Sequence, residues 1–253
     1  MRSGTIPFLI SHAPSPIPQA ERLEVVAPRP GYIVHKSFER ADPAMVEQFR
    51  GLASANISDI QGRYQTFDAR IKPIYTPMAP LCGPAFTVVA RPGDNLLATK
   101  AIHMANPGDV IVIAGGFEMN LSVWGGVMSG IAKAKGIAGV LTDALVRDVA
   151  EIRDIGLVVY ATGLTPVGPT KEGVGQINTP IVCGGVIVNP GDIIVGDEDG
   201  AVVVRKEEAE AVLARTHARM ELEKNWFEAI ARGETILEDT DDYLRERGAE
   251  IID

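Results

Sequence analysis

The residues best able to do chemistry lie in the middle of the chain, where a glycine pair is followed by an arginine next to an aspartate. These residues are Gly125–Gly126 and Arg147–Asp148. A guanidinium offers a planar fork of donors to an anionic oxygen, and a carboxylate is a hard oxygen ligand for Mg²⁺ or Mn²⁺. Small residues at a helix N-terminus leave backbone N–H groups open to a carboxylate, which the helix dipole also favours. Together these groups can bind a 2-oxo acid and polarise its carbonyl group.

The Arg147–Asp148 pair has a simpler interpretation as well. An adjacent Arg and Asp at the start of a helix commonly form a surface salt bridge, with the Asp side chain capping the helix. Spacing alone leaves both interpretations open.

Alternating short apolar runs and helical windows must position these residues. We expect strands over Ala85–Ala90, Val110–Ala114, Gly139–Thr142, Leu157–Tyr160, Val186–Val188, Ile193–Val195 and Ala201–Val204. We expect helices over Pro43–Leu52, Asn95–Met104, Val123–Lys135, Val149–Ile155 and Lys206–Ala231. The first half therefore alternates strand and helix, whereas 180–204 reads as strands joined by tight turns. This order predicts an α/β fold with a mixed sheet.

Two turns share the sequence Asn-Pro-Gly-Asp, at 106–109 and 189–192. Pro followed by Gly suits the central positions of a type II turn, so each is expected to start a buried strand.

The chain divides into three parts by composition. Residues 1–30 hold six prolines and predict an extended arm. Residues 31–205 form the expected central domain, to which the family resemblance described below assigns catalysis, and residues 206–253 form a helical C-terminal extension with one long helix. The arm is expected either to be disordered or to lie on a neighbouring subunit. The long helix is expected either to project toward a partner subunit or to pack on its own sheet.

Charge and composition exclude several functional classes. The net charge of -9 and the pI near 5.0 argue against a protein that binds nucleic acid by counterion release. No apolar run approaches the length of about 20 residues that spans a bilayer, so no membrane partner is expected and the protein is expected to be cytoplasmic. Cys82 and Cys183 lack zinc-ligand spacing and need not form a disulfide.

Three other sequence features do not support a functional site. Residues 163–170 outline a phosphate loop, but Pro169 stands where the lysine is needed. The four histidines form no ligand pair, and Ser129 has the wrong spacing for a hydrolase nucleophile.

The sequence from about Asn56 through Val204 resembles the RraA-like family, which includes 4-hydroxy-4-methyl-2-oxoglutarate / 4-carboxy-4-hydroxy-2-oxoadipate aldolases and regulators of ribonuclease activity. The resemblance rests on PGDVIVIAGG, the glycine pair in WGG, KGIAGVLTDALVRD and KEGVGQINTPIVCGGVIVNPGDIIVGDEDGAVVV. It implies a swivelling β/β/α fold, a homotrimer or a dimer of trimers, and a pyruvate aldolase site between subunits that uses a divalent metal.

The resemblance also implies roles for individual residues. Asp148 corresponds to the metal ligand, and Arg147 to the residue that holds the developing oxyanion. Glu223, on the C-terminal helix of the adjacent subunit, corresponds to a catalytic glutamate that acts through water. The amides that bind the pyruvyl carboxylate correspond to Gly125, Gly126, Val127 and Met128. Mg²⁺, or Mn²⁺ or another divalent cation, chelated by the 2-oxo acid would stabilise a pyruvate enolate.

The chain departs from the aldolase pattern at one position. The aldolases place an Asp where this chain has Gly126, which removes a carboxylate expected to orient water or metal. Asp143, Glu118 or Asp59 are candidates to replace it. Three functions are therefore compared: a metal-dependent lyase acting as pyruvate aldolase and oxaloacetate decarboxylase, a non-catalytic regulator that binds a protein partner, and another enolate-forming lyase.

Overall fold

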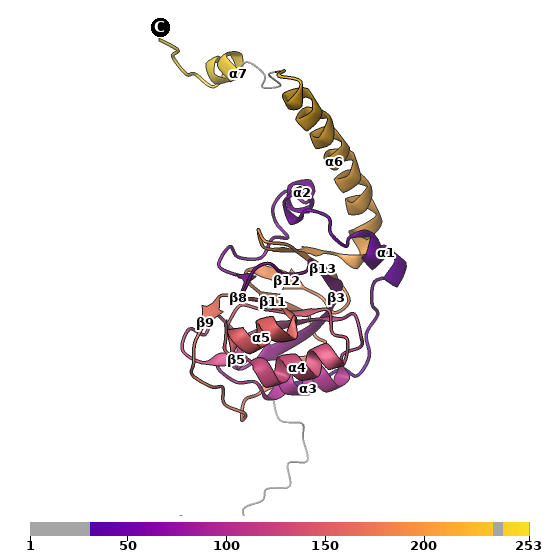
Figure 1. Ribbon diagram of the computed structural model, residues 1–253, viewed down its shortest axis with the longest axis vertical. Helices are drawn as coiled ribbons and strands as arrows, with labels where there is room; N and C mark the ends of the chain where they lie inside the picture. The colour runs from indigo at the N-terminus through magenta and orange to yellow at the C-terminus, as the bar shows by residue number, and fades with distance from the viewer. Residues whose placement is uncertain (1–30, 235–239, 253) are drawn as a thin grey trace, which may run out of the picture. The chain divides into compact units, whose positions relative to one another are not determined.

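A large mixed sheet forms the centre of the protein, as the computed structural model shows for residues 31–234 and 240–252 (Figure 1). The path through this nine-stranded sheet is β1-β10-β3-β4-β6-β8-β2, and β13 joins β3 to β14. Its strands are β1 (Tyr32–Val34), β2 (Lys72–Pro73), β3 (Leu81–Ala90), β4 (Val110–Ala114), β6 (Gly139–Thr142), β8 (Val158–Ala161), β10 (Gly175–Ile177), β13 (Ile193–Gly196) and β14 (Ala201–Val204). The predicted arm, 1–30, lies outside the described residues.

Two small sheets complete the β structure. One has the order β5-β7-β9 and the other pairs β11 with β12. Their bounds are β5 (Ser122–Trp124), β7 (Leu145–Val146), β9 (Gly163–Leu164), β11 (Ile181–Cys183) and β12 (Val186–Val188).

The long strand β3 joins two directions of pairing. Its first residues pair antiparallel with β13, with Leu81 opposite Gly196, and its later residues pair parallel with β4, with Ala85 opposite Val110. The end of β3 also pairs antiparallel with β10. The expected mixed sheet is therefore confirmed.

The helices lie in two groups (Figure 1). Three helices cover one face of the large sheet, and their apolar side chains pack on the strands: α3 (Leu96–Met104), α4 (Gly126–Ala134) and α5 (Val149–Ile155). Another group packs around β13 and β14: α1 (Pro43–Gln48), α2 (Ser54–Ile60) and α6 (Ala209–Ala231). A 3₁₀ turn over Lys206–Glu208 precedes α6, and α7 (Thr240–Glu246) follows it.

The predicted start of one helix was wrong. The helix expected from Val123 begins at Gly126, because Ser122–Trp124 forms β5. Val123 and Trp124 are buried, and β-branched and aromatic side chains suit a buried strand. Smaller differences are that α1 ends at Gln48 and that Asn95 is the N-cap of α3.

The two Asn-Pro-Gly-Asp turns have the expected scaffold role. Gly108 and Gly191 have positive φ angles of 86° and 89°, and each turn is closed by a hydrogen bond from the Asp N–H to the Asn carbonyl, 3.1 Å in both cases. Each turn leads into a buried strand, β4 or β13.

Within the described residues, no helix is both long enough and apolar enough to cross a membrane.

Candidate active site

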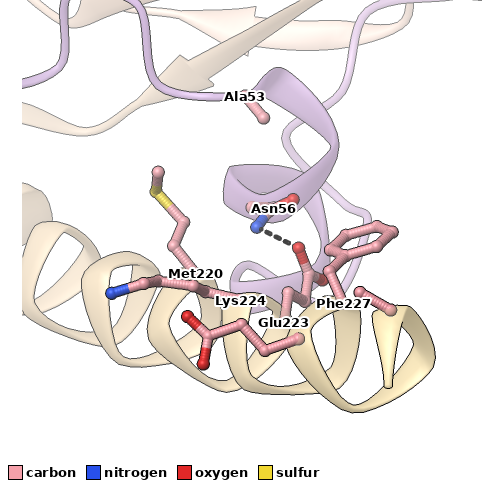
Figure 2. A pocket seen from close by; sticks show the side chains of 8 residues that line it. Ala53, Asn56, Met220, Glu223, Lys224 and Phe227 are labelled. Atoms are coloured by element: carbon pink, nitrogen blue, oxygen red, sulfur yellow. Dashed lines mark hydrogen bonds between the residues drawn. The ribbon is translucent and has the colours of Figure 1, made fainter. Parts of the chain in front are cut away.

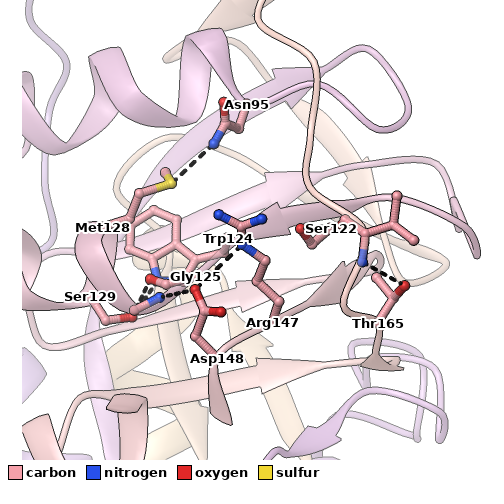
Figure 3. Close-up of polar contacts among 11 residues, drawn as sticks. Asn95, Ser122, Trp124, Gly125, Met128, Ser129, Arg147, Asp148 and Thr165 are labelled. Carbon is pink, nitrogen blue, oxygen red and sulfur yellow. Dashed lines mark hydrogen bonds and ion pairs between the residues drawn. The ribbon is translucent and has the colours of Figure 1, made fainter. Parts of the chain in front are cut away.

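Two parallel strands bring the glycine pair next to the Arg–Asp pair. In β5 and β7, Ser122 lies opposite Leu145 and Trp124 lies opposite Val146. The Arg147 N–H donates to the Trp124 carbonyl at 3.0 Å. Because each strand is followed directly by a helix, the N-termini of α4 and α5 lie side by side (Figure 3).

The N-terminus of α4 has open backbone donors. Gly125 is its N-cap, in extended conformation and with no side chain to cap the helix, and the first helical bond runs from the Ser129 N–H to the Gly125 carbonyl at 3.0 Å. The N–H groups of Val127 and Met128 precede that bond and have no partner within the helix. Ser129 is scaffold, since its buried hydroxyl accepts from Trp124 Nε1 at 2.8 Å and donates to the Gly125 carbonyl at 3.0 Å.

Asp148 does not cap α5 in the ordinary way. It is the N-cap residue, but its side chain makes no capping bond, and its backbone is left-handed with φ 60° and ψ 42°. This conformation is uncommon for residues other than glycine, although Asp tolerates it better than most. The strain turns the carboxylate toward α4, where Oδ2 accepts from the Gly126 N–H at 3.0 Å and lies 3.4 Å from Arg147 Nε. Of the simpler interpretation of the pair, the ion pair is present, but the capping bond is not.

Asp148 is suited to holding a hydrated divalent cation. Its Oδ1 has no hydrogen-bond partner among the described residues, and the side chain is 36% exposed. No cluster of three His, Cys, Asp or Glu side chains that could hold a metal occurs in the parts of the chain that the structure covers. Mg²⁺ commonly keeps several waters and takes only one or two protein carboxylates. One free carboxylate oxygen beside a substrate pocket fits that pattern of ligands.

A pocket of about 470 Å³ opens in front of these groups. The structure places five of the predicted residues on its wall: Gly125, Val127, Met128, Arg147 and Asp148. Gly126 stands behind them and holds Asp148. The remaining wall is formed by Asn95, Thr99, Trp124, Ile131, Gly168, Pro169 and Lys171.

Sequence reasoning missed two polar residues of this pocket, Asn95 and Lys171. Asn95 is 5% exposed, and its Oδ1 has no hydrogen-bond partner, while its Nδ2 contacts the Met128 sulfur at 3.2 Å (Figure 3). Lys171 forms no ion pair with any described acidic residue. A buried amide oxygen without a protein partner can accept a hydrogen bond from water or from a polar group in the pocket. Both residues belong to segments whose sequence gives no sign of proximity to Arg147.

The glycines of the site lie close to the side chains of Arg147 and Asp148. A Cβ on Gly125 would lie 2.7 Å from Asp148 Oδ2, and a Cβ on Gly168 would lie 2.8 Å from Arg147 Nη1. A Cβ on Gly126 would lie 3.2 Å from Glu151 Cβ and 3.3 Å from Asp148 Cβ. Gly126 is not among the glycines with positive φ, so its constraint is space and not backbone conformation.

None of the three candidates for the missing carboxylate lines this pocket. Asp143 is buried and accepts from Gly115 and Gly184 N–H groups at 2.6 and 3.2 Å, and its burial raises the pKa of the carboxyl group. Glu118 is bound to the Asn120 N–H at 2.6 Å, which lowers its pKa. Asp59 lies on α2. All three have structural partners of their own.

Glu223 lies in a different pocket, between α2 and α6 (Figure 2). Its two oxygens accept from Arg219 Nε and Asn56 Nδ2, both at 2.8 Å. Arg219 also lies 3.8 Å from Asp59 and over the Trp226 ring. Glu223 and Asp148 of one chain therefore do not share a pocket.

Comparison with known proteins identifies the family. The RraA-like family model, described as Aldolase/RraA, matches residues 54–203. The chain belongs to the RraA-like family.

Relatives within the RraA-like family carry both enzymatic and regulatory names. A Halalkalibacterium halodurans protein, provisionally assigned as a 4-hydroxy-4-methyl-2-oxoglutarate aldolase, is 38% identical over 176 residues, which are 70% of this chain and 83% of that protein. The 4-hydroxy-4-methyl-2-oxoglutarate aldolase of Thermus thermophilus is 34% identical over 111 residues, 44% of this chain and 68% of the relative. The crystal structure of Streptomyces coelicolor RraAS2, described as an unusual member of the RNase ES inhibitor RraA family, is 26% identical with a TM-score of 0.65, and the match covers 74% of this chain and 98% of that one.

Proposed function

We propose that this protein is a C–C lyase dependent on a divalent metal, which releases pyruvate from 4-hydroxy-2-oxo dicarboxylic acids and decarboxylates oxaloacetate. One observation carries the proposal: a strained Asp148 holds its carboxylate between Arg147 and the open N-terminus of α4, in a single pocket. An RraA-like relative named as an aldolase supports the same reaction class.

The chain offers a separate contact to each end of such a substrate. The N–H groups of Val127 and Met128 bind the carboxylate next to the 2-oxo group, as an anion at a helix N-terminus. The Arg147 guanidinium donates to the 2-oxo oxygen. Lys171 and Asn95 face the distal half, where a second carboxylate and a hydroxyl group would lie.

Asp148 would hold Mg²⁺ or Mn²⁺ through its free oxygen, with water and substrate as the other ligands. A divalent cation bound there supplies Lewis-acid polarisation of the 2-oxo group.

In the reaction, the C3–C4 bond breaks and its electron pair moves toward the 2-oxo group. In the aldol substrate the 4-hydroxyl group loses its proton and becomes a carbonyl, and in oxaloacetate the C4 carboxylate leaves as CO₂. Arg147 stabilises the negative charge that develops on the 2-oxo oxygen. C3 then takes up a proton, and pyruvate is released.

Glu223 of a neighbouring subunit is proposed to accept and return the proton through water. Asn56 and Arg219 hold this carboxylate in one orientation within its own chain. A site shared in this way requires an oligomer, which we propose to be a homotrimer or a dimer of trimers. Mixing Asp148→Asn subunits with Glu223→Gln subunits should restore activity, because some mixed interfaces regain both carboxylates.

A pyruvate-release assay tests the proposal. Oxaloacetate and several 4-hydroxy-2-oxo acids are supplied with Mg²⁺, and again with EDTA. Pyruvate released above the metal-only background, and lost with EDTA and in Asp148→Asn, is the expected result. No release above background with any of these substrates would reject the lyase and favour a protein that binds a partner without catalysis.

A further inference from the structure

A buried carboxylate next to the pocket, that of Asp94, accepts hydrogen bonds from four donors, three of which lie in a loop far away in the chain. Asp94 is 2% exposed. Its Oδ1 accepts from the Leu96 N–H at 2.9 Å, at the start of α3. Its Oδ2 accepts from Thr170 Oγ1 at 2.7 Å, the Glu172 N–H at 2.6 Å and the Gly173 N–H at 2.8 Å.

The charge of Asp94 is stable in this position. Burial alone would raise the pKa of the carboxyl group, but its hydrogen bonds to the four donors outweigh burial and lower the pKa. Asp94 is therefore ionised at neutral pH, and its bonds are charge-assisted, which makes them stronger than neutral ones.

Backbone hydrogen bonds also join the residues around Asp94 to Thr170. The Asn95 N–H donates to the Thr170 carbonyl at 3.0 Å, and the Thr170 N–H donates to the Gly93 carbonyl at 2.9 Å. The segment that contains Gly173 lies so close to Asp94 that a Cβ on Gly173 would be 2.9 Å from Asp94 Cγ. The loop over residues 168–173, which we call the 168–173 loop, is thereby attached to the N-terminus of α3.

The 168–173 loop also reaches the other end of the pocket. Gly168 packs against the Arg147 guanidinium so closely that its Cβ position is 2.8 Å from Nη1. Between these two attachments the loop carries Lys171, which lines the same pocket as Asn95. Asp94 is hydrogen-bonded to the 168–173 loop, and it directly precedes Asn95 in sequence.

We infer that Asp94 is a positioning residue, which fixes Lys171 and Asn95 relative to Arg147 and so sets a preference for 2-oxo acids with a second, distal carboxylate. This inference rests on the proposed function, because it takes the same pocket as the substrate site. A short 2-oxo acid such as pyruvate needs only Arg147, Asp148 and the α4 N-terminus. A 2-oxo dicarboxylate also needs Lys171 at a fixed distance from them.

The test compares the binding of two unreactive probes by calorimetry in the presence of Mg²⁺: pyruvate, and 2-oxoglutarate, which carries the distal carboxylate. We expect Asp94→Asn to weaken 2-oxoglutarate binding by about tenfold or more, since a lost charge-assisted contact is worth about 1.4 kcal/mol or more. Pyruvate binding should change by less than about twofold. Lys171→Met should show the same selective loss.

Hydrogen exchange separates positioning from contact. Asp94→Asn should speed exchange of the Glu172 and Gly173 amides, whereas Lys171→Met should leave them protected. Thr170→Val, which removes only one donor to Asp94, keeps the test available if Asp94→Asn does not fold, and should give a smaller loss in the same direction.

The matched control is Asp192→Asn. Asp192 is also buried and accepts backbone N–H groups, from Asn189 at 2.8 Å and Lys206 at 3.3 Å, but it lies in the turn before β13. It should change neither the ratio of the two affinities nor exchange in the 168–173 loop.

Equal weakening of both probes by Asp94→Asn, or no change in either, would overturn the inference. Because the readout is binding and loop exchange, it is independent of turnover. If the wild-type protein releases no pyruvate but Asp94→Asn still selectively weakens 2-oxoglutarate binding, the lyase is rejected and the positioning role of Asp94 stands.

Discussion

The left-handed backbone of Asp148 makes a prediction about stability that is separable from catalysis. Asp148→Ala and Asp148→Gly both remove the carboxylate, and both leave the Gly126 N–H without its partner. They differ in backbone, because the φ of 60° and ψ of 42° are unfavourable for Ala and freely accessible to Gly.

The magnitude follows from two opposing terms. A left-handed conformation costs a residue with a Cβ about 1–2 kcal/mol, while the extra freedom of Gly in the unfolded chain costs about 0.4–1 kcal/mol. The lost hydrogen bond is common to both variants and cancels. The free energy of unfolding of Asp148→Gly should therefore be about 1 kcal/mol higher than that of Asp148→Ala. This difference corresponds to a Tm higher by about 2–4 °C for a domain of this size.

Urea unfolding of the two variants measures this difference, and the pyruvate-release assay is run on the same samples. Both variants should lack metal-dependent activity, although their stabilities differ. An Asp148→Ala protein as stable as Asp148→Gly would show that the backbone at this position is not strained, and would refute the argument that strain turns the carboxylate toward α4.

Three further predictions concern the site and its support. Arg147→Ala should lower metal-dependent oxaloacetate decarboxylation by about 10²–10³-fold, as expected for removal of an oxyanion donor, and a loss below threefold in kcat would exclude that role. Gly126→Asp should lower the same activity, because its Cβ would crowd Asp148 Cβ at 3.3 Å; a gain in activity would instead support a lost orienting carboxylate. Because the folded-state pKa of Asp94 is lowered, its stabilising effect is present above the ordinary pKa of 3.8 and is lost as pH falls further. Acid unfolding should thus show a smaller loss of stability below about pH 4 in Asp94→Asn than in the wild type, and equal losses would contradict the shift.

Six strands of the large sheet, β3, β4, β6, β8, β13 and β14, were predictable from sequence because they are almost entirely buried, whereas the short strands β1, β2 and β10 of the same sheet were missed. Runs such as Val110–Ala114 and Ala201–Val204 are continuously apolar, and each is preceded by a turn or glycine that marks its start. The strands β5, β7 and β9 were not predictable, since each has only two or three residues and is defined by a partner far away in the chain. This is why the start of α4 was placed too early.

The candidate site was predictable in its centre and not at its edge. Arg147 and Asp148 stand together in sequence, and a glycine pair at a predicted helix start leaves backbone donors open to an anion. Asn95 and Lys171 could not be found in this way, because their segments are brought together by tertiary contacts, namely the hydrogen bonds of Asp94 and the backbone bonds between residues 93–95 and Thr170. The left-handed backbone of Asp148 was equally invisible, since Asp before a helix ordinarily indicates a cap.

In the proposed site, Asp148 and a bound 2-oxo acid together hold a divalent cation. Calorimetric titration of Mg²⁺ into the wild-type protein, with and without oxalate, tests it most directly, with Asp148→Asn as the matched variant that keeps the side-chain shape. We expect weak Mg²⁺ binding alone, at least tenfold tighter binding with oxalate, and no tightening in Asp148→Asn. Equal Mg²⁺ affinity with and without oxalate in the wild type, or unchanged tightening in Asp148→Asn, would contradict the account.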